Sequence, residues 1–182
     1  MDRLACLAEL IHQRNANGDA IAKLIGRPAE IGHVGEYIAS QVSKIRLEES
    51  ASHKGFDGRF CEGPLAGKTV NIKWYPKREG VLDITPETLP DCYLVLAGPK
   101  TSASTSKGGT RPWVIEAVFL FDAKKLRELL KQRGVKVGSA TGVAEELWRA
   151  AKVYPSGKSD LLTLTDDQRR LLTMFGGKAP GA

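Results

Sequence analysis

Long hydrophobic runs and paired cysteine motifs are both missing from this chain of 182 residues. No apolar stretch approaches the roughly 20 residues that a membrane-spanning helix needs. The first residues, MDRLACLAELIHQRN, have a helical pattern and lack the apolar core of a signal peptide, so we expect a cytoplasmic protein without a membrane segment. The three cysteines, Cys6, Cys61 and Cys92, are scattered and form no CxxC pair, which argues against a zinc site.

Negative charge is in the minority, because 27 lysines and arginines outnumber 21 acidic residues and give a net charge of +6. The excess is uneven: residues 1–50 contain six bases and seven acids, whereas residues 112–182 contain twelve bases and eight acids. Such a bias favours a polyanionic partner, nucleic acid above all. With 42% hydrophobic residues, the chain has the composition and length of one globular domain with its own core.

The spacing of apolar residues predicts helices and strands in a mixed order. Helices are expected at residues 2–13, 19–25, 29–45, 123–133 and 143–151, and after a capping box at Thr165. Strands are expected at residues 56–60, 68–75, 92–97 and 113–121, with residues 46–50 either a strand or an extended linker. This order predicts an N-terminal helical segment (1–28), one α/β domain (29–178) with a central mixed sheet of four or five strands, and a frayed tail (179–182).

Two of the predicted strands form a hairpin that carries polar side chains on one face. Side chains alternate along a strand, so Asp57 and Arg59 share one face of the first strand, and Asn71, Lys73 and Tyr75 share one face of the second. The hairpin can therefore bring Asp57 beside Asn71 and Lys73. An acid, a second oxygen ligand and a lysine are what a magnesium-dependent phosphodiester hydrolase needs.

Each of these residues also has a plainer interpretation. Asp57 suits a turn near glycines, and Lys73 suits a solvated position on a strand. Glu36, which lies roughly opposite the apolar stripe of its predicted helix, is either a surface glutamate or a side chain that projects along the sheet edge toward Asp57.

Over about residues 29–121 the chain resembles the PD-(D/E)xK nuclease superfamily, which includes restriction endonucleases and many repair nucleases. The resemblance lies in a helix with GEYIA, then KGFDGRF, then KTVNIKW. The family places an acid on its first helix, an aspartate on its second strand and an acid-x-lysine motif on its third. Glu36, Asp57 and Asn71-Ile72-Lys73 occupy those places here. The resemblance implies a restriction endonuclease-like core of a helix, three strands, a helix and a further strand.

The resemblance also implies a cofactor and catalytic roles. Mg²⁺ (or Mn²⁺) would be held by Asp57, Asn71 and the backbone carbonyl of Ile72, with Glu36 acting through water or on a second ion. Glu36, Asp57, Asn71 and Lys73 would form the catalytic set, in which Lys73 contacts the attacking water and the scissile phosphate. Two features depart from the family: Asn71 replaces an acid, and residues 86–89 leave little room for the helix expected between the third and fourth strands.

A set of basic residues near the hairpin is expected to contact DNA phosphates, which gives affinity without sequence choice. The set is Lys54, Arg59, Lys77, Arg78, Lys100, Lys107 and Arg111. The sequence thus predicts a magnesium-dependent DNA nuclease of the restriction or repair type. The alternative is an inactive nuclease-like module that binds nucleic acid or a protein. A nuclease that cuts both strands would act as a homodimer or by two successive nicks, and a partner protein could supply its specificity.

Overall fold

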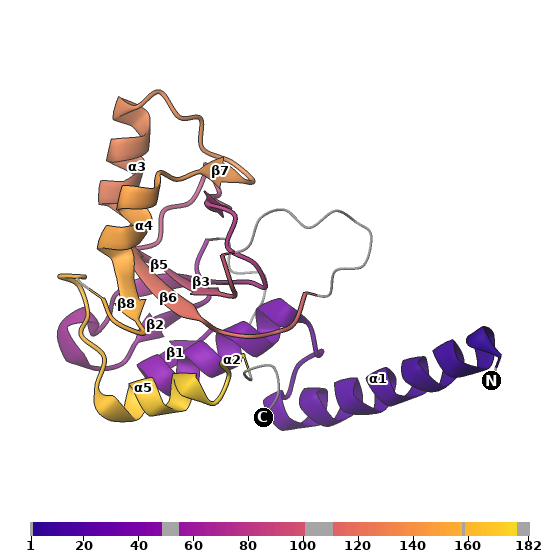
Figure 1. The fold of residues 1–182 in the computed structure, drawn as a ribbon. Coiled ribbons are helices and arrows are strands. Elements are labelled where there is room, and N and C mark those ends of the chain that lie inside the picture. The colour runs from indigo at the N-terminus through magenta and orange to yellow at the C-terminus, as the bar shows by residue number, and fades with distance from the viewer. Residues whose placement is uncertain (1, 49–54, 101–110, 158, 178–182) are drawn as a thin grey trace.

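The structure is a computed structural model, and it describes residues 2–48, 55–100, 111–157 and 159–177. These residues form an α/β fold in which helices cover both faces of a mixed six-stranded sheet (Figure 1). The helices are α1 (Arg3–Ile25), α2 (Ile31–Ser43), α3 (Ala123–Gln132), α4 (Glu145–Ala151) and α5 (Asp166–Thr173), with a 3-10 turn at Gly63–Leu65. The strands are β1 (Ile45–Leu47), β2 (Gly58–Phe60), β3 (Thr69–Tyr75), β4 (Val81–Leu82), β5 (Cys92–Ala97), β6 (Ala117–Asp122), β7 (Thr141–Gly142) and β8 (Lys152–Tyr154).

The six strands of the main sheet lie in the order β1-β2-β3-β5-β6-β8. The first three form an antiparallel meander, β5 runs parallel to β3, and β6 and β8 continue antiparallel to their neighbours. The sheet therefore has six strands, at least one more than the four or five that the sequence predicted. The missed strand, β8, follows α4 directly and has only three residues, too few to show an alternating pattern in the sequence.

Each face of the sheet has its own core. On one face, Ile38 and Val42 of α2 and Leu172 of α5 pack against side chains of β3, β5 and β6. On the other face, Leu126 of α3 and Trp148 of α4 pack against the opposite side chains of β5 and β6. Because both faces are covered, β5 is buried along its whole length, as its continuous apolar sequence predicted.

The connection from β3 to the parallel strand β5 crosses the sheet without a helix. Residues 76–91, all of which are described, contain only the short strand β4, which pairs with β7 in a separate two-stranded ribbon. Leu82 and Ile84 of this connection are buried in the core shared with α3 and α4. A crossover that lacks its helix is the departure that the spacing at residues 86–89 predicted.

The N-terminal helix differs from the prediction of two short helices broken at residues 15–18. Helix α1 is continuous for 23 residues, and it ends only at Gly26, which has a left-handed φ of 69°. A glycine inside a helix costs about 1 kcal/mol relative to alanine, so Gly18 alone is a weak helix breaker. Figure 1 shows α1 projecting away from the sheet and its covering helices.

The other elements lie close to their predicted places. The capping box at Thr165 opens α5, and the Asp122 side chain caps α3. The strand expected at residues 113–121 begins later, at Ala117. Glu116 is therefore exposed just before the strand and is not a charge within a buried strand.

None of the described helices is both long and apolar enough to cross a membrane. The predicted frayed tail, residues 179–182, lies outside the described residues.

Candidate functional site

The candidate site lies at the fork where β2 and β3 separate. The two strands pair only through Gly58 with Val70 and Arg59 with Thr69. Past Val70, the edge of β3 that faces β2 loses its strand partner. Asp57, which immediately precedes β2, occupies this fork: its carboxylate accepts a hydrogen bond from the Ile72 N–H at 2.6 Å, and its own N–H donates to the Val70 carbonyl at 2.8 Å. Two hydrogen bonds thus fix Asp57 against β3.

A glycine beside Asp57 makes this close approach of strands possible. A Cβ atom at Gly58 would lie 2.6 Å from the carbonyl oxygen of Arg46 and 2.7 Å from a methyl group of Ile45, both on β1. Contacts this short are not tolerated, so only glycine lets β1 and β2 pair at this point. The glycine that flanks the acid in the sequence therefore positions the acid in the fold.

Strand β3 shows the predicted alternation. Val70, Ile72 and Trp74 are buried, whereas Asn71 and Lys73 are half-buried on the alternate face. Gly35 of α2 lies directly over Trp74, because a Cβ there would be 3.0 Å from the Trp74 Cβ. This close packing brings α2, and with it Glu36, down to the open edge of β3.

The charges of the predicted catalytic residues interact with one another at this edge. Burial raises the pKa of Asp57, and the Ile72 hydrogen bond and the positive charges of Lys73 and Arg27 oppose that rise. Burial also raises the pKa of Glu36, and the nearby Asp57 carboxylate raises it further, against the charges of Arg27, His33 and Lys73. The structure therefore brings Glu36, Asp57 and Lys73 into one partly buried electrostatic cluster.

Arg27 is a member of this cluster that sequence reasoning missed. It lies in the connection between α1 and α2, and its guanidinium donates to a Glu36 carboxylate oxygen at 2.7 Å and to the Glu48 carbonyl at 2.9 Å. Glu36 is thus a partly buried residue with an ion-pair partner, and not a solvated surface glutamate. An arginine between Gly26 and Pro28 carries no sequence signal for this role, because nine residues separate it from Glu36.

Asn71 places a polar atom in the interior without a partner. Within the described part of the chain, its buried Oδ1 atom accepts no hydrogen bond. Its neighbour on β5, Tyr93, likewise has a buried hydroxyl that makes no hydrogen bond to the described residues. A buried carbonyl oxygen without a donor costs about 1–3 kcal/mol, and a cation or a water molecule would relieve that cost.

Several oxygen atoms in and around the fork are of the kind that Mg²⁺ prefers. Asp57 and Glu36 supply carboxylates, and Asn71 supplies a carboxamide oxygen from the face of β3 opposite the one that packs on α2; all three groups suit a hard cation. The set includes only two acids, and among the described residues no group of three or more histidine, cysteine or acidic side chains is placed to hold a metal ion. The donor chemistry therefore fits a divalent cation, with one negative charge fewer than a site built from three acids.

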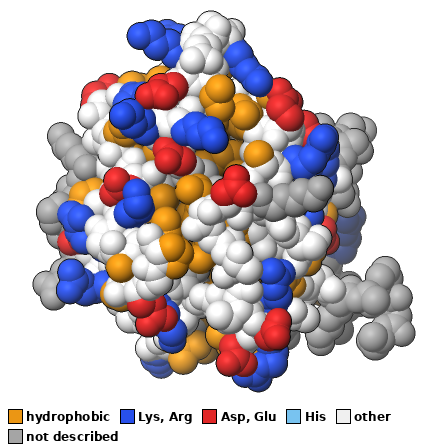
Figure 2. Space-filling model, turned by 90° about the vertical axis from the view of Figure 1, so that its left-hand side faces the viewer, with side chains coloured by type: hydrophobic (Ala, Val, Ile, Leu, Met, Phe, Trp, Pro, Cys, Tyr) orange, Lys and Arg blue, Asp and Glu red, His pale blue; other side chains and the backbone are white. Residues whose placement is uncertain are grey.

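The predicted DNA-binding bases are largely neutralised by nearby acids. Lys54 and Lys107 lie outside the described residues. Arg59 lies over the Phe56 ring, with its Nε atom 3.8 Å from Glu48. Lys77 pairs with Glu79 at 3.0 Å, and Arg78 and Lys100 both pair with Glu145 at 3.1 Å. The positive charge of the exposed Arg111 helps to lower the pKa of Glu79. Figure 2 likewise shows basic and acidic side chains interspersed over the visible face.

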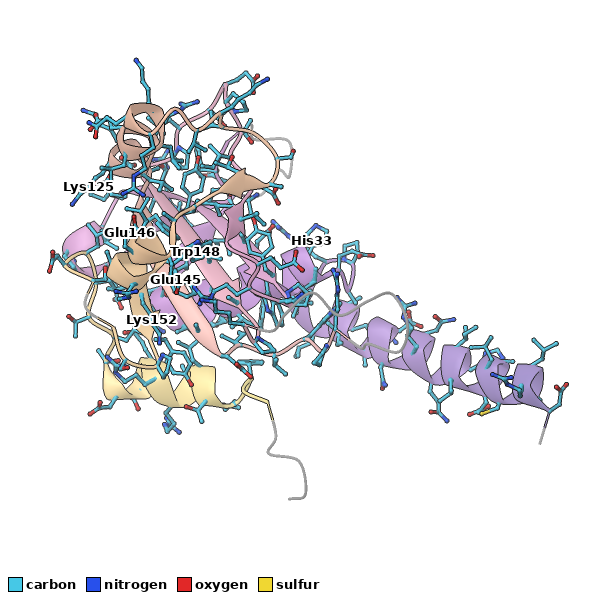
Figure 3. The ribbon with its side chains drawn as sticks, turned by 45° about the horizontal axis from the view of Figure 1, so that its top comes forward. His33, Lys125, Glu145, Glu146, Trp148 and Lys152 are labelled. Carbon is cyan, nitrogen blue, oxygen red and sulfur yellow. The ribbon has the colours of Figure 1, made fainter. Side chains whose placement is uncertain are left out.

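A hollow next to the ends of β3 and β5 gathers several of these charges. It is lined by Arg78, Lys100, Glu116, Glu145, Arg149 and Lys152, together with apolar residues. The Arg78 guanidinium lies 5.5 Å from the centre of the Phe119 ring and 5.9 Å from that of Trp148, so aromatic faces hold it in place. Figure 3 shows Glu145 and Trp148 on α4 and Lys152 directly after its end. Sequence reasoning missed Arg149 and Lys152, because their helical and strand positions look like ordinary surface positions.

No protein-family model matches the chain, and no curated protein sequence is significantly similar to it. The functional interpretation therefore depends on the geometry of the fork and its charges.

Proposed function

We propose that this protein is a magnesium-dependent nuclease with a restriction endonuclease-like core that hydrolyses phosphodiester bonds in DNA. The observation that carries the proposal is the joint placement of Asp57, Glu36 and Lys73 around the open edge of β3, where Lys73 lowers the pKa of both carboxyl groups and Asp57 raises that of Glu36. Isolated surface residues would not share a partly buried cluster of this kind.

The order of elements supports the same proposal. Helix α2 is followed by the antiparallel meander β1-β2-β3, and β5 then lies parallel to β3. This is the order of a helix, three strands and a further strand that the PD-(D/E)xK resemblance implies, apart from the missing helix in the crossover. The positions of the motif residues support it as well, with Glu36 on the helix, Asp57 directly before the second strand and Lys73 on the third, although Asn71 stands where the family has an acid.

Each residue at the fork has a defined task in this proposal. A divalent cation held by Asp57 and Asn71 would polarise the scissile phosphate and acidify a bound water. Lys73 donates a hydrogen bond to the phosphate and orients the attacking water by its positive charge. Asp57 is held in register by the Ile72 N–H, so only its second carboxylate oxygen is left for a ligand. Glu36 orients water once Arg27 releases it.

A second candidate function is a nuclease-like module that binds nucleic acid without cleaving it. The ion pair between Arg27 and Glu36 favours it, because a guanidinium already neutralises one of the two acids. The carboxamide of Asn71 favours it as well, because the site has lost a negative charge at the position where the family carries an acid.

The test is incubation of supercoiled plasmid with the protein and either Mg²⁺ or Mn²⁺. Asp57→Asn and Lys73→Ala should each abolish nicking, because the first removes the ligand charge and the second removes the phosphate contact. Lys124→Ala, an exposed lysine on α3, is the matched control and should nick as the parent does. Nicking that survives both site substitutions would reject the proposed site. DNA retention without cleavage in parent and variants would establish the binding module instead.

A further inference from the structure

Helix α1 exposes an apolar surface that its own chain leaves uncovered. None of its 23 residues is buried. Five of its large apolar side chains are strongly exposed, from 47% at Ile11 to 74% at Leu24. A helix of this length, about 34 Å, gains most of its stability in proteins from packing, and here the first half packs on nothing that the structure describes.

The second half of the same helix forms one wall of a groove. The groove is lined by α1 residues from Leu10 to Ala22, by Pro28, Ala29 and Glu30 of the following connection, and by Trp113. Ile21 and Ala22 are half-buried there, whereas Leu4 and Leu7, in the first half, are 72% and 52% exposed. One molecule thus carries both an exposed apolar ridge and a groove whose lining mixes apolar side chains with polar and charged ones.

The ridge and the groove belong to one continuous helix, so the ridge cannot fold back into the groove of its own chain. The geometry points to a second copy of this chain as the occupant. In a symmetric antiparallel pair, the first half of each α1 lies in the groove along the second half of the other α1. Such an interface is self-complementary, as a two-fold dimer requires.

The charges along α1 match this arrangement. Arg3 and Arg14 lie eleven positions apart, and Asp19 and Glu30 also lie eleven positions apart, in a segment that would run in the opposite direction. Antiparallel pairing that sets Arg14 opposite Asp19 of the second copy therefore also sets Arg3 near Glu30 of that copy. None of the four side chains has an ion-pair partner within the described part of its own chain, so all four are available for pairing between copies.

The apolar residues fit the same register. With Arg14 opposite Asp19, Ile11 faces Ala22 and Leu7 faces the end of the other helix near Ile25. Gly18 lies close to the symmetry axis, and nothing lies within 4 Å of the place where its Cβ would be, which leaves room for a second helix to approach. Parallel pairing would instead set Arg14 against Arg14 and Leu7 against Leu7, and it would leave both grooves empty.

The first test measures the mass of the full chain by sedimentation equilibrium. We expect a dimer, and Leu7→Glu should raise its dissociation constant at least tenfold because two charges enter the apolar interface. Ala16→Glu is the matched control: Ala16 is exposed on the same helix, about 180° around the axis from Leu7 at 100° per residue. A parent that is monomeric at all concentrations, or equal effects of the two variants, would overturn the proposal.

The second test is charge exchange across the interface. Arg14→Asp and Asp19→Arg should each weaken the dimer several-fold, and the double variant should restore the parent dissociation constant to within about threefold. Restoration is the decisive result, because helical positions 14 and 19 do not face each other within one chain. Failure of the double variant to recover would reject the antiparallel register.

The third test fixes the orientation with cysteines. The exposed Cys61 is first replaced by serine. In the antiparallel pair the two Cys6 residues lie about 31 Å apart along the helices, far beyond the ~7 Å limit for a disulfide, whereas an introduced Asn17→Cys lies at the symmetry axis. Oxidation should therefore cross-link Asn17→Cys and leave Cys6 uncross-linked. Cys6 cross-linking, or a monomer that binds phospholipid vesicles through α1, would overturn the proposal.

Discussion

The Asp57 carboxylate accepts the N–H of Ile72 at 2.6 Å, two residues past the last point at which β3 pairs with β2. The aspartate thus completes the hydrogen bonding of the strand edge that β2 leaves open. One of its oxygens has this structural task, and the other accepts no hydrogen bond from the described residues. A single side chain therefore links the local fold to the proposed chemistry.

Two substitutions at this position should separate structure from chemistry. Asp57→Ala removes the acceptor and leaves the N–H of the buried Ile72 unpaired, so we expect a loss of about 1–3 kcal/mol in the free energy of unfolding. Asp57→Asn keeps an acceptor oxygen and should fold normally, yet it should lose Mg²⁺-dependent nicking. Urea unfolding and plasmid nicking of the two variants check this. An unstable Asp57→Asn protein would show that the charge itself has the structural task.

The pH dependence of this effect has a definite sign. Burial raises the pKa of Asp57 in the folded protein above its ordinary value of 3.8. A carboxyl group with a raised folded pKa contributes stability below its unfolded pKa, and that contribution is lost as the pH rises through the folded pKa. At pH 7 the ionised Asp57 therefore costs stability, and Asp57→Asn should have a higher free energy of unfolding than the parent. The difference should shrink as the pH falls and disappear well below the ordinary pKa of 3.8, where the carboxyl group is protonated in both the folded and the unfolded parent.

Arg27 should control access of a cation to the fork. Arg27→Gln removes the ion pair to Glu36, so we expect tighter Mg²⁺ binding at neutral pH, measured by calorimetry or by the rise in melting temperature with added Mg²⁺. The charge of Arg27 lowers the pKa of both Glu36 and Asp57. Without it, both carboxyl groups should become protonated at a higher pH, so Mg²⁺ binding should also be lost at a higher pH on acidification.

The control for that variant is Arg46→Gln, which removes an exposed arginine from β1. It should change neither the affinity for Mg²⁺ nor the pH at which Mg²⁺ binding is lost on acidification. Unchanged Mg²⁺ binding in Arg27→Gln would mean that Glu36 is not part of the cation site.

Asn71 should respond to metal in a way that an ordinary buried residue would not. Asn71→Asp adds a third negative charge beside Asp57 and Glu36, so without metal the melting temperature should fall by several degrees. With Mg²⁺ the variant should melt at a higher temperature than the parent, because a third carboxylate strengthens binding of a hard cation. A melting temperature that stays low with Mg²⁺ present would show that the orphaned oxygen of Asn71 does not face a cation.

The longer strands of the main sheet could be predicted because their chemistry is local. Val70, Ile72 and Trp74 alternate with Asn71 and Lys73, and the structure buries the first set as that alternation requires. The capping box at Thr165 was equally local, since both of its hydrogen bonds lie within four residues. Such signals need only the period of a strand or a helix turn.

The features that were missed depend on distant parts of the chain. Arg27 reaches Glu36 through a bend at Gly26 that reorients the chain, and its role follows from that bend. Strand β8 is defined by its pairing with β6 and not by its own three residues. The break predicted at residues 15–18 was wrong: the local penalty of Gly18 is small, and no described atom lies within 4 Å of the place where its Cβ would be.

The hollow beside α4 offers a test of DNA affinity that is independent of cleavage. Glu145 holds both Arg78 and Lys100; burial raises its pKa, but hydrogen bonds from these two bases outweigh burial and lower it overall. Glu145→Gln should release two positive charges and tighten binding to duplex DNA. Because each phosphate contact contributes about −0.9 to the slope of log K against log salt concentration, the slope should steepen by up to about 1.8.

The neighbouring residue supplies the control for that measurement. Glu146 lies next to Glu145 on α4 but pairs with Arg133 at the end of α3, at 2.8 Å, and does not line the hollow (Figure 3). Both substitutions change the net charge of the protein by the same amount. A larger gain in affinity and slope for Glu145→Gln than for Glu146→Gln therefore isolates the released Arg78 and Lys100 from the general effect of charge. Equal gains would show that DNA responds to net charge alone and that the hollow does not contact phosphate.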